Sequence, residues 1–563
     1  MKAEQKITYT TIGSSEEFHS EFEKAVEQVK KDFGKLFPNM IGGVASKSEK
    51  IVEIKSPIDT RILLGRHQLA SKEETARAVE LAHKAFPVWR DLGWRKRVEI
   101  LRRAADRISA RKYYLAAIMS YEAGKNRLES MGEVEESADL IRYYCQVMED
   151  NKGYTKPMNQ ISPNEKTMSI LVPYGVWGTI APFNFPMALS TGMVTGALVT
   201  GNTVVFKPSH DTPIIGYYLW EVLTEGGVPK DVIHFVAGSG SEVGATIVEH
   251  PNTQGMVFTG SYQVGMQIYR SFSKQYPKPV VVEMGGKNPC YVGKTADLEA
   301  ASEGVMRSAF GYGGQKCSAC SRAYLAPEVK DRFVKKLLDR TKTIKLGNPL
   351  LRDVFLGPVI NSSAQQSYEK YVERIKAAGG QILCGGVSRK DGEFGHGYYV
   401  EPTIVYMKDR NNELFYEEMF LPILLLTDVE DVEEALELSN RAVYGLTAGI
   451  FSKDKKEVQK FLDGIEAGVT YVNRKGGATT GAWPGVNPFG GWKASGSTGP
   501  NALGPYYLVK FLREQSRTVV DMDLPFMTEI EQRKPKLILK RTAKKSMTDR
   551  KKARPVRKKK RVI

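Results

Sequence analysis

The sequence predicts an α/β protein in which helices cover mostly parallel sheets. GNTVVFKPS at 201–209 is a short β-rich run that stops at Pro, TPIIGYYLWEVLTEGG at 212–227 is helical, and DVIHFVAG at 231–238 is β-rich again. Strand, helix and strand at this spacing form a βαβ unit, whose two strands are parallel. GMVFTGS at 255–261 and PVVVEMGG at 279–286 repeat the theme, because each carries an apolar run to a polar residue at its end. Open α/β sheets bind their ligands at that end of the strands.

The segments before residue 150 are predicted to be mostly helical. Apolar residues recur at helical spacing in 14–33, and a long helical pattern covers 98–125. Between them, SKEETARAVELAHKAF at 71–86 opens with a capping box formed by Ser71 and Glu74.

A second alternation of helices and strands follows residue 317 and predicts a second α/β domain. Its helical patterns include DRFVKKLLDRTKTI at 331–344 and VEEALELSNRAVYG at 432–445. TKPMNQISPNEKTMSI at 155–170 has a Pro–Asn turn between two extended runs and predicts a β-hairpin.

Composition places the chain among ordinary globular proteins, with 42% hydrophobic and 26% charged residues. No run of 18 apolar residues is present, so no membrane span is expected. The first residues, MKAEQKITYTTIGSSEEF, lack an apolar signal core, and five cysteines are an odd number for a disulfide framework. We therefore expect a cytoplasmic protein with reduced cysteines.

The net charge of +17 is concentrated at the C-terminal end. Residues 540–563 hold thirteen Lys or Arg against one Asp, a net of +12, which leaves +5 for the rest of the chain. This tail is expected to be disordered. It is either a solvated extension or an arm for nucleic acid or another polyanion, whose binding would weaken steeply with salt.

Two cysteines, Cys317 and Cys320, lie three positions apart in GYGGQKCSACSR at 311–322. A zinc site would need further Cys or His ligands at suitable spacing, and the sequence offers none; no metal is expected. A thioredoxin-like redox pair would open a helix after a strand, whereas this motif precedes the strand-like AYLA. A catalytic thiol and two ordinary buried cysteines remain as the alternatives on this motif alone.

Two polar residues elsewhere favour the catalytic thiol. Glu283 follows an apolar run and precedes two glycines, where it is either a solvated loop acid or a buried acid with a raised pKa that suits a general base. Asn184 in APFNFP is either a turn residue or a fixed N–H donor for an oxyanion.

Two glycine-rich turns could bind phosphate. FTGSYQVG holds Gly260 and Ser261, and AGSGSEVG holds Gly240 and Gly244; in both a strand passes into a helix whose N–H groups can face a phosphate. Neither follows G-x-G-x-x-G closely, so each is a weak signal by itself. Lys207 ends the strand VVFKPS, either as a cofactor contact or as a surface lysine.

Together these motifs resemble those of one family, the aldehyde dehydrogenases. The resemblance covers residues 40–520 and rests on APFNFP, VVFKPS, FTGS, VVEMGGKNP, GGQKCSACSR, EEMFLPIL and NPFGGWKASG in this order. Within the family the sequence is most similar to 1-pyrroline-5-carboxylate dehydrogenases, through KCSACSR, TTGAWPGVNPFGG and GPYYLVKFLREQSRTV.

The resemblance implies a mechanism and a set of residues for it. Cys317 would attack an aldehyde, Asn184 would hold the oxyanion with the Cys317 backbone N–H, and Glu283 would activate the water that releases an acid. The implied reaction is oxidation of L-glutamate γ-semialdehyde to L-glutamate in proline catabolism. The alternatives are another semialdehyde, such as that of succinate or 2-oxoglutarate, or a polyanion-binding protein on an inactive dehydrogenase fold.

The resemblance also implies NAD or NADP as the cofactor. Many NAD-preferring members carry an acid where this chain has His210, and without that carboxylate a 2′-phosphate is tolerable. The residues implied to bind the cofactor are Pro182, Phe183, Lys207, Ser209, His210, Gly240, Gly244, Gly260, Ser261, Val264, Gly285, Glu418 and Phe420.

For the substrate, the resemblance implies Ser318, Gly481 and Ala482 at the α-carboxylate and Phe489 against the aliphatic part. Glu136 would face the ammonium, or it is a solvated helix acid.

The implied fold is that of the aldehyde dehydrogenases, with three parts and a tail. Residues 1–154 and 172–285 would form a Rossmann-type cofactor domain, and 286–493 an α/β catalytic domain. The oligomerisation arm would comprise 155–171 and 494–533, and 534–563 would be the basic tail. The hairpin near 155–171 and the strand near 505–520 would be exchanged between subunits of a homo-oligomer.

Overall fold

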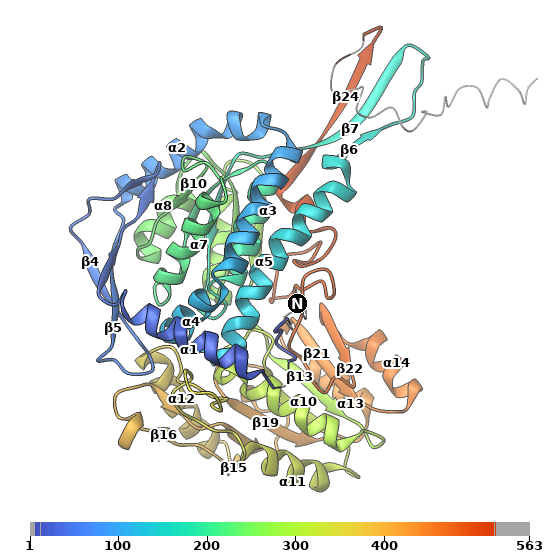
Figure 1. Ribbon diagram of the computed structural model, residues 1–563. Coiled ribbons are helices and arrows are strands. Elements are labelled where there is room, and N and C mark those ends of the chain that lie inside the picture. The colour runs from blue at the N-terminus through green and yellow to red at the C-terminus, as the bar shows by residue number, and fades with distance from the viewer. Residues whose placement is uncertain (1–5, 12, 523, 525–563) are drawn as a thin grey trace, which may run out of the picture.

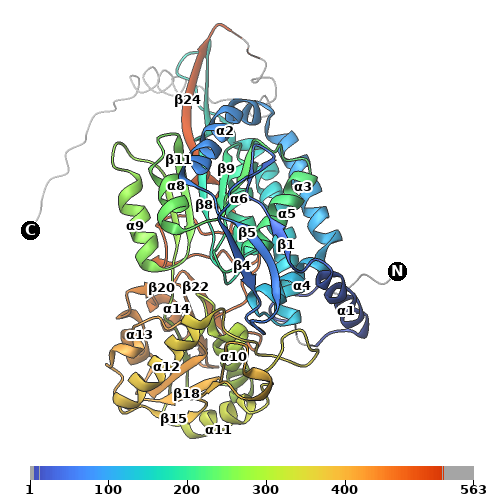
Figure 2. The same cartoon turned by 90° about the vertical axis from the view of Figure 1, so that its left-hand side faces the viewer.

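The computed structural model describes residues 6–11, 13–522 and 524, so the basic tail lies outside the described residues. Two seven-stranded sheets form the body, one above the other in Figures 1 and 2. The predicted α/β class is confirmed.

The first sheet has the order β12-β11-β8-β9-β10-β2-β3, and its first five strands are parallel. Each of these strands therefore ends at the same edge of the sheet. The strands are β12 (Val280–Glu283), β11 (Thr253–Thr259), β8 (Val176–Ile180), β9 (Thr203–Lys207), β10 (Ile233–Phe235), β2 (Met40–Ile41) and β3 (Val44–Ala45). The helices around it are α2 (Lys72–Asp91), α3 (Trp94–Ala110), α6 (Ala188–Val199), α7 (Pro213–Glu225), α8 (Ala245–Glu249) and α9 (Tyr262–Phe272).

The second sheet has the order β15-β18-β19-β14-β13-β21-β22 and is parallel except for β15. Its strands are β15 (Gln381–Cys384), β18 (Thr403–Tyr406), β19 (Ile423–Asp428), β14 (Cys320–Leu325), β13 (Asn288–Val292), β21 (Thr447–Phe451) and β22 (Val469–Val472). Its helices are α10 (Leu298–Phe310), α11 (Lys330–Thr341), α12 (Ser362–Ala377), α13 (Val432–Asn440) and α14 (Lys455–Gly464). Short pairs β16 (Ser388–Arg389) with β17 (Tyr399–Val400) and β20 (Tyr444–Gly445) with β23 (Trp492–Lys493) lie beside it.

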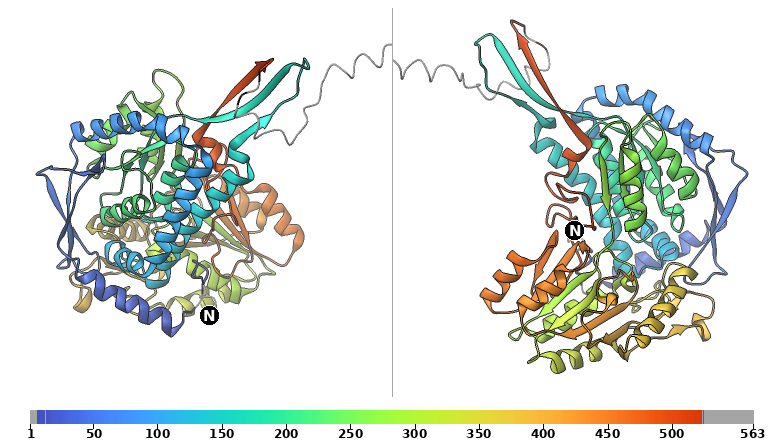
Figure 3. Two further views of the ribbon diagram at one scale, coloured as in Figure 1. Left: turned by 45° about the horizontal axis from the view of Figure 1, so that its top comes forward. Right: turned by 180° about the vertical axis from the view of Figure 1, so that it is seen from behind.

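A third sheet projects from the body as a long arm (Figures 1 and 3). It consists of β6 (Thr155–Pro157), β7 (Glu165–Pro173) and β24 (Leu512–Val520), all antiparallel. The predicted hairpin is confirmed, and Glu165 N–H bonds the Ser162 carbonyl across its Pro–Asn turn at 3.2 Å. That this arm is exchanged between subunits stays a prediction.

The N-terminal region contains more β structure than the sequence predicted. The helices α1 (Glu16–Lys30), α4 (Lys112–Ala123) and α5 (Arg127–Asp150) are present, and the capping box of Ser71 and Glu74 is confirmed. A three-stranded sheet of β1 (Lys35–Phe37), β5 (Leu63–Gln68) and β4 (Ile51–Lys55) was not predicted. These strands are short and mixed in polarity, so their pattern carries no clear alternation.

The residues 284–287 join the two large sheets, because β12 ends at Glu283 and β13 begins at Asn288. The domain boundaries drawn from the sequence stay a prediction. In the described part of the chain, no helix combines the length and the apolar character needed to span a membrane.

Candidate active site

One cavity brings together most of the predicted catalytic and substrate residues. The volume in which the centre of a water molecule fits is about 90 Å³. Its lining includes Cys317, Ser318, Glu283, Gly481, Ala482, Phe489 and Glu136, as well as Tyr9, Tyr144, Phe185, Lys316, Thr480 and Tyr507. These residues come from segments that are far apart in the sequence, and the fold alone assembles them.

The candidate nucleophile lies on a glycine turn between α10 and β14. After Phe310 the chain passes through left-handed conformations at Tyr312 (φ 50°), Gly313 (φ 63°) and Gly314 (φ 67°). A Cβ at Gly314 would lie 2.2 Å from the Leu421 carbonyl oxygen, so this position requires glycine. Cys317 follows on the cavity wall.

The two cysteines of the motif have different environments. Cys317 is partly exposed and lines the cavity, whereas Cys320 is the first residue of β14 and is 1% exposed. Burial raises the pKa of the Cys317 thiol to about 12, and the carboxyl groups of Glu418 and Glu283 add to the shift. A thiol with a pKa raised in this way is mostly protonated at neutral pH, so a thiolate needs either added positive charge or a proton acceptor.

Asn184 is buried between β8 and α6, although it is not among the residues that line the cavity. Its side-chain Nδ2 donates to the Gln315 carbonyl at 3.0 Å, and its Oδ1 accepts from Phe185 N–H at 3.1 Å. These two bonds fix the amide orientation and connect it to the loop that carries Cys317. One of its two N–H groups is left for an oxyanion.

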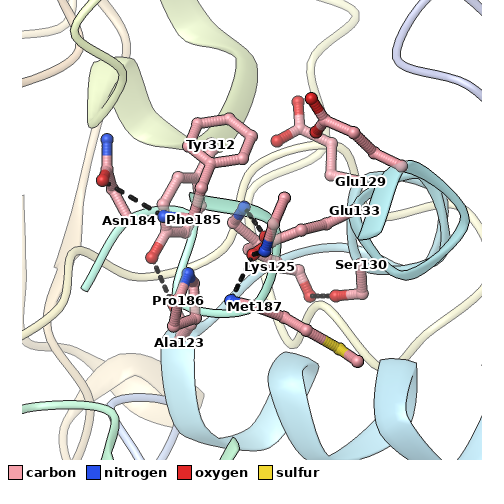
Figure 4. A network of polar contacts seen from close by, with 12 residues as sticks. Ala123, Lys125, Glu129, Ser130, Glu133, Asn184, Phe185, Pro186, Met187 and Tyr312 are labelled. Carbon is pink, nitrogen blue, oxygen red and sulfur yellow. Dashed lines mark hydrogen bonds and ion pairs between the residues drawn. The ribbon is translucent and has the colours of Figure 1, made fainter. Parts of the chain in front are cut away.

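A buried ion pair, which the sequence reasoning missed, supports the Asn184 turn (Figure 4). Lys125 and Glu133 are both fully buried, and the Lys125 ammonium donates to the Glu133 carboxylate. Glu133 also accepts from the backbone N–H groups of Met187 (2.8 Å) and Ala188 (3.1 Å) at the start of α6.

The same ammonium lies against two aromatic rings. It is 3.7 Å from the ring centre of Phe185 and 4.7 Å from that of Tyr312. Phe185 follows Asn184, and Tyr312 opens the turn before Cys317, so Lys125 contacts the amide loop and the nucleophile loop together. Tyr312 is anchored in turn by its hydroxyl, which donates to the Ala123 carbonyl at 2.8 Å.

Glu283 is the last residue of β12, and its carboxyl faces the cavity. Its Oε2 is buried without a hydrogen-bond partner among the described residues. Burial raises the pKa of Glu283 to about 8, and the positive charge of Lys510 opposes the shift. The alternative of a solvated loop acid is therefore wrong, and the group has the character of a base near neutral pH.

The predicted cofactor residues follow the five parallel strands, at one edge of the first sheet. Pro182 and Phe183 come after β8, Lys207 is the last residue of β9 and is followed by Ser209 and His210, Gly240 and Gly244 come after β10, Gly260, Ser261 and Val264 after β11, and Gly285 after β12. The side chain of Ser261 caps α9 by accepting from Val264 N–H, and the space around Gly240 is open. Helix N-termini and open glycine turns at a strand edge fit the phosphates of a dinucleotide.

Lys207 is not the surface lysine of the alternative interpretation. It is 6% exposed, and its ammonium donates to the Pro208 carbonyl at 3.1 Å. Burial lowers its pKa to about 8. His210, three residues on, is exposed.

Glu418 and Phe420 lie against the segment between the two large sheets. Glu418 accepts from Gly286 N–H at 2.8 Å, and burial raises its pKa to about 7. A Cβ at Gly285 would lie 2.0 Å from the Glu418 carboxylate, so a larger residue there would displace this carboxylate. Phe420 packs edge-on against Phe183 with 5.9 Å between ring centres.

The substrate end of the cavity contains a glycine turn and a buried acid. Gly481 has φ +90°, and Arg474 holds the turn by donating to the carbonyls of Thr480 (2.9 Å) and Gly481 (2.5 Å). Glu136 is 7% exposed and accepts a hydrogen bond from the Tyr9 hydroxyl. Glu136 is therefore not a solvated helix acid; Tyr9 was not predicted, because no local pattern marks it.

Known proteins resemble this chain over most of its length. The aldehyde dehydrogenase family model matches residues 44–516. A 1-pyrroline-5-carboxylate dehydrogenase of Geobacillus sp. (strain WCH70) is 38% identical over 507 residues, covering 89% of this chain and 96% of that protein. 1-Pyrroline-5-carboxylate dehydrogenase 2 of Bacillus subtilis (strain 168) is 38% identical over 508 residues, with the same coverage of 89% and 96%.

Solved structures give the same picture. A 1-pyrroline-5-carboxylate dehydrogenase from Thermus with bound NAD has a TM-score of 0.86 and 34% identity, over 92% of this chain and 100% of that chain. A betaine aldehyde dehydrogenase from Staphylococcus aureus in complex with NAD⁺ has a TM-score of 0.82 and 28% identity, over 90% of this chain and 98% of that chain.

Proposed function

The chain belongs to the aldehyde dehydrogenase family, and on that premise we propose that it oxidises L-glutamate γ-semialdehyde to L-glutamate with NAD or NADP. The semialdehyde is the open form of 1-pyrroline-5-carboxylate, which the names of relatives at 36–38% identity specify. The observation that carries the proposal is one cavity holding a thiol, a base and the candidate anchors for an amino acid. These groups are Cys317, Glu283, Ser318, Gly481 and Glu136.

The covalent step begins at Cys317. Its thiolate adds to the aldehyde carbon, and the resulting oxyanion accepts from the Asn184 amide and the Cys317 backbone N–H. Oxidation of this adduct to a thioester requires a hydride acceptor. The residues after the five parallel strands, with Glu418 and Phe420, would hold a nicotinamide dinucleotide that supplies this chemistry.

The thioester is then released by water. Glu283 accepts a proton from that water as it attacks the thioester carbon, and the thiol of Cys317 leaves. The raised pKa of Glu283 suits this role, because a base that titrates near the working pH combines basicity with a usable ionised fraction.

The substrate anchors differ in charge. Ser318 and the turn at Gly481 and Ala482 would bind the α-carboxylate, Glu136 the ammonium, and Phe489 the aliphatic part. A carboxylate bound by hydroxyl and backbone donors and an ammonium bound by a carboxylate together describe an amino acid.

We propose further that the chain forms homo-oligomers through the arm of β6, β7 and β24. The shape of the arm supports this, because β7 pairs with β24 in an antiparallel ribbon that extends away from the body (Figure 3). A cytoplasmic location and polyanion binding by residues 540–563 stay predictions from the sequence. Light scattering tests the assembly, and salt-dependent retention on DNA by full-length and tail-deleted chains tests the tail.

One assay tests the proposed activity. NADH and NADPH formation is followed with 1-pyrroline-5-carboxylate and with a panel of other aldehydes, using Cys317→Ala as the control. We expect turnover of the semialdehyde by the wild type and none by the variant. Fast turnover of an unrelated aldehyde without turnover of the semialdehyde would refute the substrate, and full activity of the variant would refute the mechanism.

A further inference from the structure

We infer that residues 6–11 form a strap that closes the amino-acid end of the cavity, and that Tyr9 is a specificity-determining residue selecting aldehydes that carry an α-amino-acid group. The inference rests on the proposed function for the identity of the substrate. The strap precedes the residues that match the family model, which begin at 44.

The strap is docked on the body at both of its ends. The Lys6 ammonium pairs with the Asp139 carboxylate at 2.6 Å, and Asp139 also accepts from Trp483 Nε1 at 3.0 Å. Ile7 is 7% exposed within the main hydrophobic core. At the other end, Arg307 donates to the Thr11 carbonyl at 3.3 Å.

The strap packs on α5 at Gly132. A Cβ at Gly132 would lie in van der Waals contact with the strap, 3.4 Å from the Tyr9 ring and 3.5 Å from the Thr8 carbonyl carbon. Gly132 is four residues before Glu136, so the two lie on the same face of the helix. The strap thus lies directly on the helix face that presents the buried acid.

The Tyr9 side chain is part of the cavity wall. Its hydroxyl donates to Glu136 Oε2, which leaves Oε1 of the same carboxylate to accept from a substrate ammonium. Its ring packs edge-on against Phe185 (5.6 Å, 88°) and Trp483 (5.9 Å, 64°). The Lys316 ammonium lies 5.9 Å from the ring centre. Tyr9 therefore positions the acid and also contacts the residues next to Asn184 and Cys317.

The next residue of the strap reaches the second candidate anchor. A Cβ at Gly481 would lie 3.2 Å from Thr10 Cγ2, and one at Gly476 would lie 3.1 Å from the same side chain. In an α-amino acid the ammonium and the carboxylate are attached to one carbon, so their anchors must be neighbours. The strap contacts both anchors, Glu136 through Tyr9 and the Gly481 turn through Thr10.

The lysines near Glu136 are each paired with another carboxylate, which leaves Glu136 able to bind a substrate ammonium. Lys125 is paired with Glu133, Lys316 donates to Glu129 at 2.8 Å, and Lys6 is paired with Asp139. Burial raises the pKa of Glu136 to about 8, while the Tyr9 hydrogen bond lowers it. The Tyr9 bond thus favours the ionised form of Glu136, which is the form that binds an ammonium.

The test compares Tyr9→Phe, Tyr9→Ala and Lys6→Ala with Tyr269→Phe, a matched change at a half-exposed tyrosine on α9. For each, kcat and KM are measured with the semialdehyde and with propanal, which has no amino-acid group. Calorimetry measures the Kd of L-glutamate and of glutarate, which lacks only the ammonium.

For Tyr9→Phe we expect KM for the semialdehyde to rise about tenfold or more, as for loss of a hydrogen bond to a charged group, with kcat/KM for propanal within about twofold. The preference for L-glutamate over glutarate should shrink by a similar factor. Tyr9→Ala should lose the preference and accept propanal at least as well as the wild type. Lys6→Ala should raise KM for the semialdehyde without changing kcat, and Tyr269→Phe should change neither.

Equal losses on both aldehydes in Tyr9→Phe would overturn the inference, because they would indicate a general structural role. A wild type that binds glutarate as tightly as L-glutamate would overturn it as well. If the wild type oxidises propanal but not the semialdehyde, the proposed function fails. A wild-type preference for L-glutamate that Tyr9→Phe abolishes would still support the strap as an amino-acid selector.

Discussion

Replacing Lys125 with methionine tests whether the buried ion pair positions the catalytic loops. Methionine keeps most of the side-chain length but removes the ammonium, and it leaves the Glu133 carboxylate buried with only two backbone donors, Met187 N–H and Ala188 N–H. The substitution also removes the contacts of the Lys125 ammonium with the rings of Phe185 and Tyr312. The variant therefore loosens the Asn184 turn and the Cys317 loop without touching either catalytic group.

The size of the effect follows from these contacts. Removing one partner of a buried pair costs about 3–5 kcal/mol. The two remaining N–H donors still stabilise the Glu133 carboxylate, so this cost lies near the lower limit of the range, and the lost cation–π contacts add roughly 1 kcal/mol. We expect a loss of about 4 kcal/mol. Because the unfolding entropy grows with chain length, this lowers the melting midpoint of a chain of this size by only roughly 3–4 °C. A misplacement of the Asn184 amide by about 1 Å would lower kcat by up to ~100-fold.

The assay combines melting midpoints with steady-state kinetics for Lys125→Met, Glu133→Gln and the double variant. Glutamine still accepts from both N–H groups and carries no charge, so the double variant should recover most of the lost stability. Lys493→Met is the control, because its pair with Glu466 is solvent-exposed and worth less than about 1 kcal/mol. Additive losses in the double variant, or a Lys125→Met enzyme with unchanged midpoint and kcat, would refute the reasoning.

Three further predictions concern the catalytic groups. Where thioester release limits turnover, kcat should decrease as the pH falls through a midpoint near 8, because Glu283 must be ionised to act as a base. Lys510→Met should move this midpoint to higher pH in a pH profile. A shift to lower pH would contradict the charge effect assigned to Lys510. Gly314→Ala should abolish turnover and lower the melting midpoint, because its backbone is left-handed and its Cβ would meet a carbonyl oxygen at 2.2 Å. The control is Gly379→Ala, which is left-handed (φ +75°) with open space around it; it should lower the free energy of unfolding by about 1–2 kcal/mol and leave turnover unchanged. Asn184→Ala should reduce kcat by about 100- to 1000-fold while the thiol is still alkylated by iodoacetamide at the wild-type rate; a loss of less than tenfold would argue against an oxyanion role.

The sequence by itself determined the elements whose causes are local. Apolar runs that stop at Pro or Gly predicted β9 and β12, and they placed Lys207 and Glu283 at strand ends, as the structure has them. The capping box of Ser71 and Glu74 is local as well, because both of its bonds lie within four residues. Ordered motifs then identified the family and, with it, the fold; they also predicted Cys317 as the nucleophile, which stays a prediction.

Tertiary structure alone decided which polar groups are buried together. Lys125 and Glu133 meet the Asn184 turn some 50 residues further along the chain, and Tyr9 meets Glu136 across a separation of 127 residues. No periodicity marks such partners, because a helix acid looks the same in sequence whether it faces water or a cavity. Burial sets the pKa of Glu136 and Glu283 near 8 and that of Cys317 near 12, and burial is a property of the assembled fold rather than of neighbouring residues.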